Sequence, residues 1–169
     1  MHSTMKRCFT AALIAFAALA PYTAWAQSDV TVNLTAQRVI ASTGGKETFA
    51  PGDQARPGDV LEYRATYHNS ATSRVRQLAA TLPVPKGMTF VPGTASPGVL
   101  ASLDGKTFEP LPLKRRVKLA DGREVVREVP ASEVRWLRWP LGTLDAKTDR
   151  VVRARVRVEP VAVAVLVKR

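Results

Sequence analysis

The segment from Val60 to His68 alternates apolar and polar residues, and this period of two limits the fold more than any other feature of the chain. Its apolar face would hold Leu61, Tyr63, Ala65 and Tyr67, and its polar face Glu62, Arg64, Thr66 and His68. Such alternation is typical of a β-strand with one buried face. Turn-forming residues bound it, Pro57-Gly58-Asp59 before and Asn69-Ser70 after. A second strand is predicted at about Val75–Leu82, because Pro83 and Pro85 cannot donate hydrogen bonds to a ladder.

Further stretches with the same alternation follow along the chain. Strands are predicted at Val30–Val39, Val99–Leu103, Val134–Leu141 and Val151–Glu159, with Glu47–Arg56 as a connection or a short edge strand. Asp104-Gly105 and Asp121-Gly122 predict two hairpins with tight primed turns, in which both central residues have positive φ. Since no stretch after Ala26 shows a sustained helical period, the pattern predicts an all-β sandwich of about seven to nine strands.

The first 26 residues have the three parts of a secretory signal peptide. Lys6-Arg7 is the positive part, Phe9–Ala20 is the apolar run, and Ala24-Trp25-Ala26 is the cleavage site. A retained membrane anchor is the alternative, but Pro21 interrupts the run before the roughly 20 residues that span a bilayer. The leader therefore predicts export to the periplasm or beyond the cell, with cleavage after Ala26.

The residues after the leader are predicted to form one domain at 27–160, followed by a short apolar tail or extra strand at 161–169. The chain has a single cysteine, Cys8, and it lies within the leader. The exported chain is therefore predicted to contain no disulfide, no thiol chemistry and no cysteine-based metal site. No transmembrane segment is expected after cleavage.

Several motifs together resemble the DUF11 family of bacterial exported proteins. They are Pro57-Gly58-Asp59-Val60-Leu61-Glu62-Tyr63, Asn69, Leu82-Pro83, Pro85–Thr94, Ser102–Phe108 and Val134–Gly142. The resemblance covers most of the chain after the leader. It implies an immunoglobulin-like antiparallel β-sandwich, in a family with no single known activity. The family often has an acidic residue just before its Leu-Pro, where this chain has Ala80-Thr81, so any ligand role of that acid is not expected here.

Basic residues exceed acidic ones, and two groups of them are candidates for binding anions. The leader carries two positive charges and no negative one, so cleavage lowers the formal net charge from +11 to +9. The predicted hairpin with arms Arg115–Ala120 and Arg123–Glu128 is the densest basic region, and its turn would set Arg116 opposite Arg127 and Val117 opposite Val126. Arginines also line one face of the last strand. The candidate anion contacts are Arg115, Arg116, Lys118, Arg123, Arg127, Arg153, Arg155, Arg157 and Trp136.

Two tryptophans three residues apart must point to opposite faces of a regular strand. Trp139 shares its parity with Leu137 and Leu141, so it is predicted to be buried. Trp136 is predicted at the surface or at a sheet edge, where its ring would be available to stack on a sugar or a base.

The chain offers little for catalysis or metal binding. His68 is the only histidine after the leader, and its place on the polar strand face predicts a solvated side chain rather than a general base. Zinc would need several His or Cys ligands. The turn aspartates Asp53, Asp59, Asp104, Asp121 and Asp145 are interpreted as turn formers rather than calcium ligands. We therefore predict no enzyme activity, no metal, no cofactor and no small-molecule substrate.

Three functional hypotheses remain from the sequence. The first is a non-catalytic exported β-sandwich that acts as a structural or protein-interaction module of the cell envelope. The second is a protein that binds anionic envelope polymers, such as lipopolysaccharide, acidic glycan or nucleic acid, through its basic faces. The third, an envelope hydrolase, fits the available residues poorly.

Overall fold

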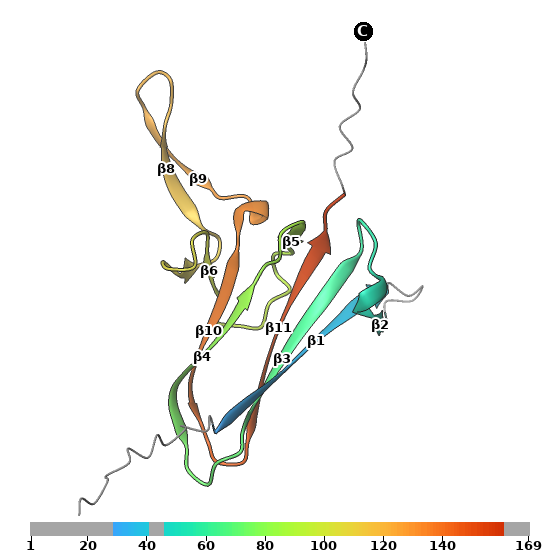
Figure 1. The fold of residues 1–169 in the computed structure, drawn as a ribbon. Coiled ribbons are helices and arrows are strands. Elements are labelled where there is room, and N and C mark those ends of the chain that lie inside the picture. Colours follow the sequence, from blue (N-terminus) through green and yellow to red (C-terminus); the bar gives the residue numbers. More distant parts are fainter. Residues whose placement is uncertain (1–28, 41–45, 161–169) are drawn as a thin grey trace, which may run out of the picture.

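The computed structural model describes residues 29–40 and 46–160, and the predicted leader and tail lie outside them. The described chain contains eleven strands and two short 3-10 turns (Figure 1). The strands are β1 Val30–Ile40, β2 Thr48–Pro51, β3 Val60–Asn69, β4 Val75–Pro83, β5 Met88–Phe90, β6 Leu100–Ser102, β7 Glu109–Pro110, β8 Lys114–Lys118, β9 Glu124–Glu128, β10 Trp136–Leu144 and β11 Asp149–Val158; the turns are η1 Gly52–Gln54 and η2 Ala131–Glu133. The predicted all-β, antiparallel sandwich is confirmed. The strand number is higher than predicted because ladders of two or three residues, such as β5 and β7, are too short for their alternation to be recognised.

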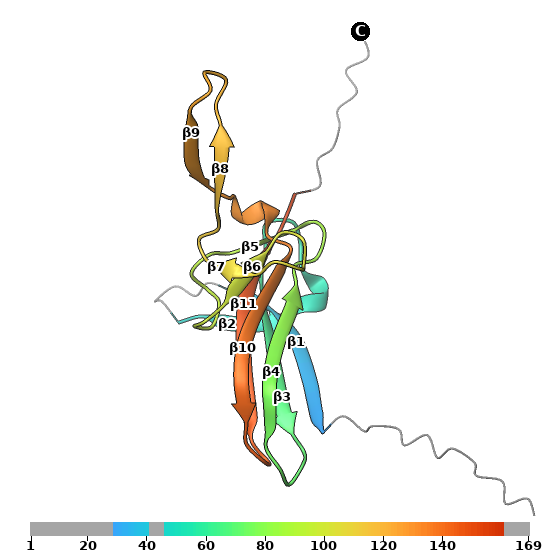
Figure 2. The ribbon, with the colours of Figure 1, turned by 90° about the vertical axis from the view of Figure 1, so that its left-hand side faces the viewer.

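Two antiparallel sheets form the sandwich, and a third sheet is a separate hairpin. The first sheet has the order β2-β1-β3-β11-β5 and the second the order β4-β10-β6-β7, while β8 pairs with β9 alone. In Figures 1 and 2 the β8–β9 hairpin extends away from the two layers. No helix in the described residues is long and apolar enough to cross a membrane.

The long strands are paired in a nested way. β3 pairs with β11 in the first sheet, and β4 pairs with β10 in the second. The β3–β4 turn and the β10–β11 turn each carry the chain from one sheet to the other, and both lie at the same end of the sandwich (Figure 1). Consequently β4 lies over β3, and β10 lies over β11.

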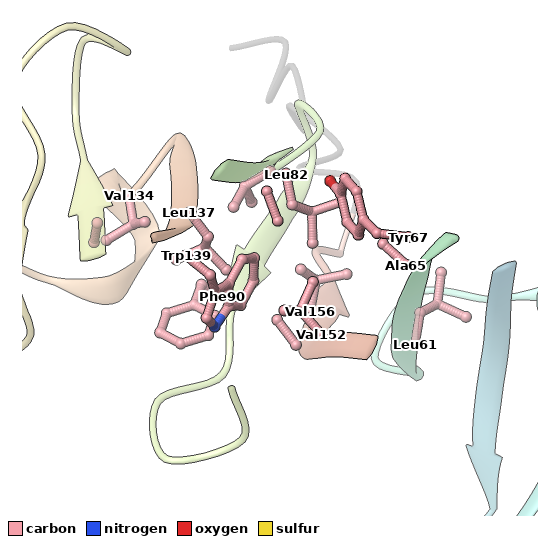
Figure 3. Packing of buried hydrophobic residues seen from close by; sticks show 14 of the residues in the cluster. Leu61, Ala65, Tyr67, Leu82, Phe90, Val134, Leu137, Trp139, Val152 and Val156 are labelled. Atoms are coloured by element: carbon pink, nitrogen blue, oxygen red, sulfur yellow. The ribbon is translucent and has the colours of Figure 1, made fainter. Parts of the chain in front are cut away.

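The core lies between these four strands and extends to Phe90 of β5, Ala101 of β6 and Val134 (Figure 3). Trp139 is 2% exposed and its indole N–H donates to the carbonyl of Ser96 at 3.0 Å, which confirms its predicted burial. Trp136 is half-buried, as predicted for the opposite face. On β11 the buried face also follows the alternation, with Val152, Ala154 and Val156 inside.

Two β-bulges interrupt the pairing of β4 with β10. One shifts the register between Pro140 and Gly142, and the other shifts it back between Gly142 and Leu144, where Gln77 on β4 has φ 56°. Each bulge reverses the parity of its own strand beyond that point. For this reason Leu144 is buried, whereas Leu141, which alternation places inside, is only half-buried.

The two predicted primed turns are absent, and the reason is the conformation of the aspartates. Gly105 and Gly122 have positive φ, but Asp104 and Asp121 do not. In the β8–β9 hairpin the N–H of Leu119 donates to the Arg123 carbonyl at 2.8 Å, so the loop has three residues instead of two.

The extra loop residue moves the hairpin register by one. Arg115 therefore pairs with Arg127, and Val117 pairs with Val125, so the predicted pairs Arg116–Arg127 and Val117–Val126 are wrong. The β6–β7 hairpin does form, but around a longer loop in which Asp104 Oδ1 accepts the N–H groups of Lys106 and Thr107.

Asn69 joins the two turns that connect the sheets. Its side chain is completely buried, and Nδ2 lies 2.9 Å from the Ser73 carbonyl in the β3–β4 turn. The same nitrogen lies 3.2 Å and 3.0 Å from the carbonyls of Leu144 and Asp145 at the β10–β11 turn. The Asn69 main chain also bonds to the second turn, through the Thr148 carbonyl and the Lys147 N–H. The buried amide of Asn69 thus links the β3–β4 turn to the β10–β11 turn.

Replacing Asn69 by Ala is expected to destabilise the fold by about 3 kcal/mol, because buried carbonyls in both turns lose their donor. Urea unfolding of the purified chain measures this loss. Asn33→Ala on the exposed face of β1 is the matched control and should cost less than about 0.5 kcal/mol. Equal effects of the two substitutions would contradict the role assigned to Asn69.

Candidate functional site

The predicted basic hairpin exists, and most of its side chains are exposed. Arg116, Lys118, Arg123 and Arg127 are exposed on the β8–β9 sheet, which projects from the body of the molecule (Figure 2). Two of its arginines have acidic partners: Arg115 contacts Glu109 at 2.6 Å, and Arg123 contacts Asp121 at 2.7 Å. The hairpin therefore presents a basic surface that Glu109 of β7 and Asp121 of its own loop partly neutralise.

The middle arginine of the β11 row, Arg155, is bound by two acidic side chains. Arg155 donates through Nε and Nη2 to Glu62 Oε2 at 3.1 Å and 3.0 Å, and it binds Glu47 in a bidentate way at 2.7 Å and 2.5 Å. Glu62 is only 3% exposed although it lies on the polar face of β3, and its other oxygen accepts from Arg64 at 3.2 Å. These groups form a stabilising ion network on the outer face of the first sheet.

The electrostatics of this network follow from its hydrogen bonds. The Arg155 guanidinium lowers the pKa of Glu47 below its ordinary value, and the Glu47 carboxylate raises the pKa of Arg155. The loop that contains Thr94 and Ser96 is bound to β11 beside the network: Ser96 Oγ accepts the Arg153 N–H, and Thr94 Oγ1 accepts the Arg155 N–H. The alternation of β3 alone placed Glu62 in solvent, and only its partners from other strands show why it is buried.

The remaining predicted contacts lie on separate surfaces. Arg153 and Arg157 are exposed on the outer face of the first sheet, beside Arg155. Trp136 lies in the second sheet, and the backbone of Gly105 packs so closely on its indole that a Cβ there would come within 2.9 Å of Nε1. The hairpin follows β7, which also belongs to the second sheet. The structure therefore does not combine the arginine row, the hairpin and Trp136 into one patch.

The groups considered for catalysis are scattered. His68 is about half exposed on the polar face of β3, where its Nδ1 lies 2.6 Å from Asp149 Oδ1. Within residues 29–40 and 46–160 no three His, Cys, Asp or Glu side chains are grouped so that they could hold a metal ion. Three backbone and side-chain hydrogen bonds, from Lys106, Thr107 and Ser102, lower the pKa of Asp104 to about 2, which fits a carboxylate that shapes its own loop.

One pocket of the described chain is mainly apolar. It has a volume of about 570 Å³ and lies at the base of the β8–β9 hairpin. Its walls include Phe90, Leu111, Leu113 and Val134, with Glu128 as the ionisable lining residue. The pocket therefore does not bring an acid and a base together.

An uncovered part of the core is the feature that sequence analysis missed. Val32 and Leu34 lie on the inward face of the first sheet, because they pair with Tyr67 and Ala65 of β3, which are both buried. Yet Val32 is 54% exposed and Leu34 is 53% exposed. Among the described residues the core thus ends at β3, and β1 carries apolar side chains that the second sheet does not cover.

The outer edge of β4 lies next to this apolar face. Among the described residues, β4 pairs with β10 on one side and with no strand on the other. Because β4 lies over β3, a position beyond its outer edge would lie over β1, and Figure 2 shows β1 extending past β4 on that side. We call Val32, Leu34 and the outer edge of β4 the β1–β4 seam.

Comparison of the chain with models of protein families, with curated proteins and with solved structures finds no match. The resemblance to the DUF11 family therefore stays a prediction.

Substituting Arg155 by Met is expected to cost about 3 kcal/mol of stability, since Glu62 would lose its main partner while remaining buried. Arg64 still contacts Glu62, which keeps the loss at the low end of the usual range. Arg157→Met on the same strand face is the control and should be nearly neutral. Thermal and urea unfolding compare the two variants, and similar stabilities would show that the network is not a structural element.

Proposed function

We propose that this chain is an exported, non-catalytic β-sandwich that acts as a structural or protein-interaction module of the bacterial cell envelope. In this proposal a partner strand binds at the β1–β4 seam. The signal-peptide pattern at residues 1–26 supports export, and the resemblance to DUF11 supports a role at the envelope.

The exposure of Val32 and Leu34 carries the proposal. Covering two half-exposed aliphatic side chains contributes about 2–3 kcal/mol, and main-chain hydrogen bonds to β4 would add to it. An added strand can form both kinds of contact together, as in other proteins that bind an extended segment at a sheet edge. A small-molecule ligand could not pair with the edge of β4 in this way.

A photoreactive amino acid in place of Leu34 tests the seam in bacterial cells that export the chain. The expected result is covalent adducts with protein after illumination, because the side chain at this position would lie under the partner strand. The control places the same group at Asn33, which is exposed on the opposite face of β1. No adducts at position 34, or the same adducts at both positions, would refute the seam as an interaction site.

The β8–β9 hairpin supports a second candidate function, the binding of anionic polymers. The hairpin extends away from the sandwich, and Arg116, Arg123 and Arg127 on it are exposed, so they can reach a charged surface. Arginine binds phosphate and sulfate groups in a bidentate way, and binding of this kind weakens steeply as salt rises.

Heparin and a single-stranded DNA oligonucleotide serve as probes for this second function, each titrated at low and at high salt. Arg116→Ser combined with Arg127→Ser should weaken binding about tenfold, since each lost contact removes about one kcal/mol or less. Arg153→Ser combined with Arg157→Ser removes the same charge from the other surface and should change it less. Binding that is insensitive to salt or to the hairpin variant would exclude this function.

A further inference from the structure

The β1–β4 seam requires a particular kind of occupant. A strand added to β4 would turn every second side chain towards Val32 and Leu34, and those side chains must be apolar. The strand must also contain no proline where it pairs with β4. A short, uncharged segment with β-branched residues at alternate positions meets these conditions.

Residues 161–167 of this chain have that pattern. The segment reads Val-Ala-Val-Ala-Val-Leu-Val, so valines occupy every second position and small or apolar residues occupy the others. Pro160 precedes it and Lys168-Arg169 follows it, while the segment itself has neither charge nor proline. The segment begins directly after the last described residue, Pro160.

The position of β11 shows which copy of the chain such a segment could reach. Arg157 pairs with Val60, so β11 ends where β3 begins. Leu34 and Val32 lie five and seven residues further along β3, opposite Ala65 and Tyr67, which is about 17–23 Å from that end. The seam is thus near the opposite end of the sandwich from the point where the segment leaves it.

The segment is too short to cover the seam of its own chain. It would first have to cross β3 and reach the layer of the second sheet, a distance of about 14 Å, or four extended residues. Five to seven more residues along β4 would be needed to reach Leu34 and Val32, so the apolar run, which ends nine residues after Val158, would end at about Leu34 and would not reach Val32. A segment from a second copy has no such restriction.

We propose that residues 161–167 of one copy add as a strand to the β1–β4 seam of a second copy. This inference rests on the proposed function of the seam and names its partner. The contact is heterologous, because the donating segment and the accepting seam are different surfaces. Repetition of the contact would build a head-to-tail chain of molecules, as expected for a structural element of an envelope.

Sedimentation velocity of residues 27–169 over a range of concentrations provides the first test. Val163→Asp combined with Val165→Asp should weaken self-association at least about tenfold, because both charges would face the apolar seam. Ala162→Asp combined with Ala164→Asp adds the same charge on the other face of the segment and should leave association nearly unchanged. Absence of self-association, or equal loss in both variants, would overturn the proposal.

Disulfide trapping provides the second test, since residues 27–169 contain no cysteine. One copy carries Leu34→Cys and the other carries Val163→Cys or Val165→Cys, and mixing them under mild oxidation should give a cross-linked pair. The pair should not form when Asn33→Cys replaces Leu34→Cys. A monomer carrying both cysteines that closes a disulfide within itself would overturn the proposal in favour of docking within one chain.

The two proposals fail in different ways. Photo-adducts at position 34 with other proteins but never with a second copy would leave the seam as an interaction site and overturn its assignment to residues 161–167. Self-association that persists in Leu34→Asp would show that the copies meet elsewhere. Leu34 is half exposed, so this last variant should keep the fold, and circular dichroism verifies that it does.

Discussion

The hydrogen bonds of one buried amide organise this sandwich. Asn69 Nδ2 lies against carbonyls of both turns that carry the chain between the sheets, and its Oδ1 accepts the Ala71 N–H within the first turn. Because both crossings are tied to one side chain, the strands leaving them must stack in a fixed way, with β4 over β3 and β10 over β11. Tyr67 follows the same arrangement: burial raises its pKa, and a backbone hydrogen bond from Thr81 of β4 opposes that rise.

This stacking also determines where the sandwich is incomplete. The first sheet continues beyond β3 to β1, whereas the second sheet stops at β4. Within residues 29–40 and 46–160, Val32 and Leu34 on the inward face of β1 are therefore left half exposed, next to an edge of β4 that pairs with no described strand. An exposed edge of this kind invites pairing with another chain, and natural proteins usually protect it. A protein whose role is to assemble would instead use such an edge.

The charged residues form two groups: some stabilise the fold through ion pairs, and others are exposed to solvent on the β8–β9 hairpin. On the outer face of the first sheet, Arg155 is held by Glu62 and Glu47, so it stabilises the fold. Most charges of the β8–β9 hairpin remain at the surface because the two strands pair only with each other, and their register sets Arg115 opposite Arg127. Water screens that like-charge pair, which a buried sheet would not tolerate.

The sequence by itself determined the strands and the buried faces of the central ones, since a period of two is a local property of the chain. Trp139 and the valine face of β11 were predicted for this reason. Only the tertiary structure decided the rest. Val32 and Leu34 lie on the same sheet face as their partners Tyr67 and Ala65, and whether they are covered depends on how many strands the opposite sheet has. The alternation of β3 predicts that Glu62 is exposed to solvent. It is buried instead because Arg155, which is distant in sequence, pairs with it and also binds Glu47.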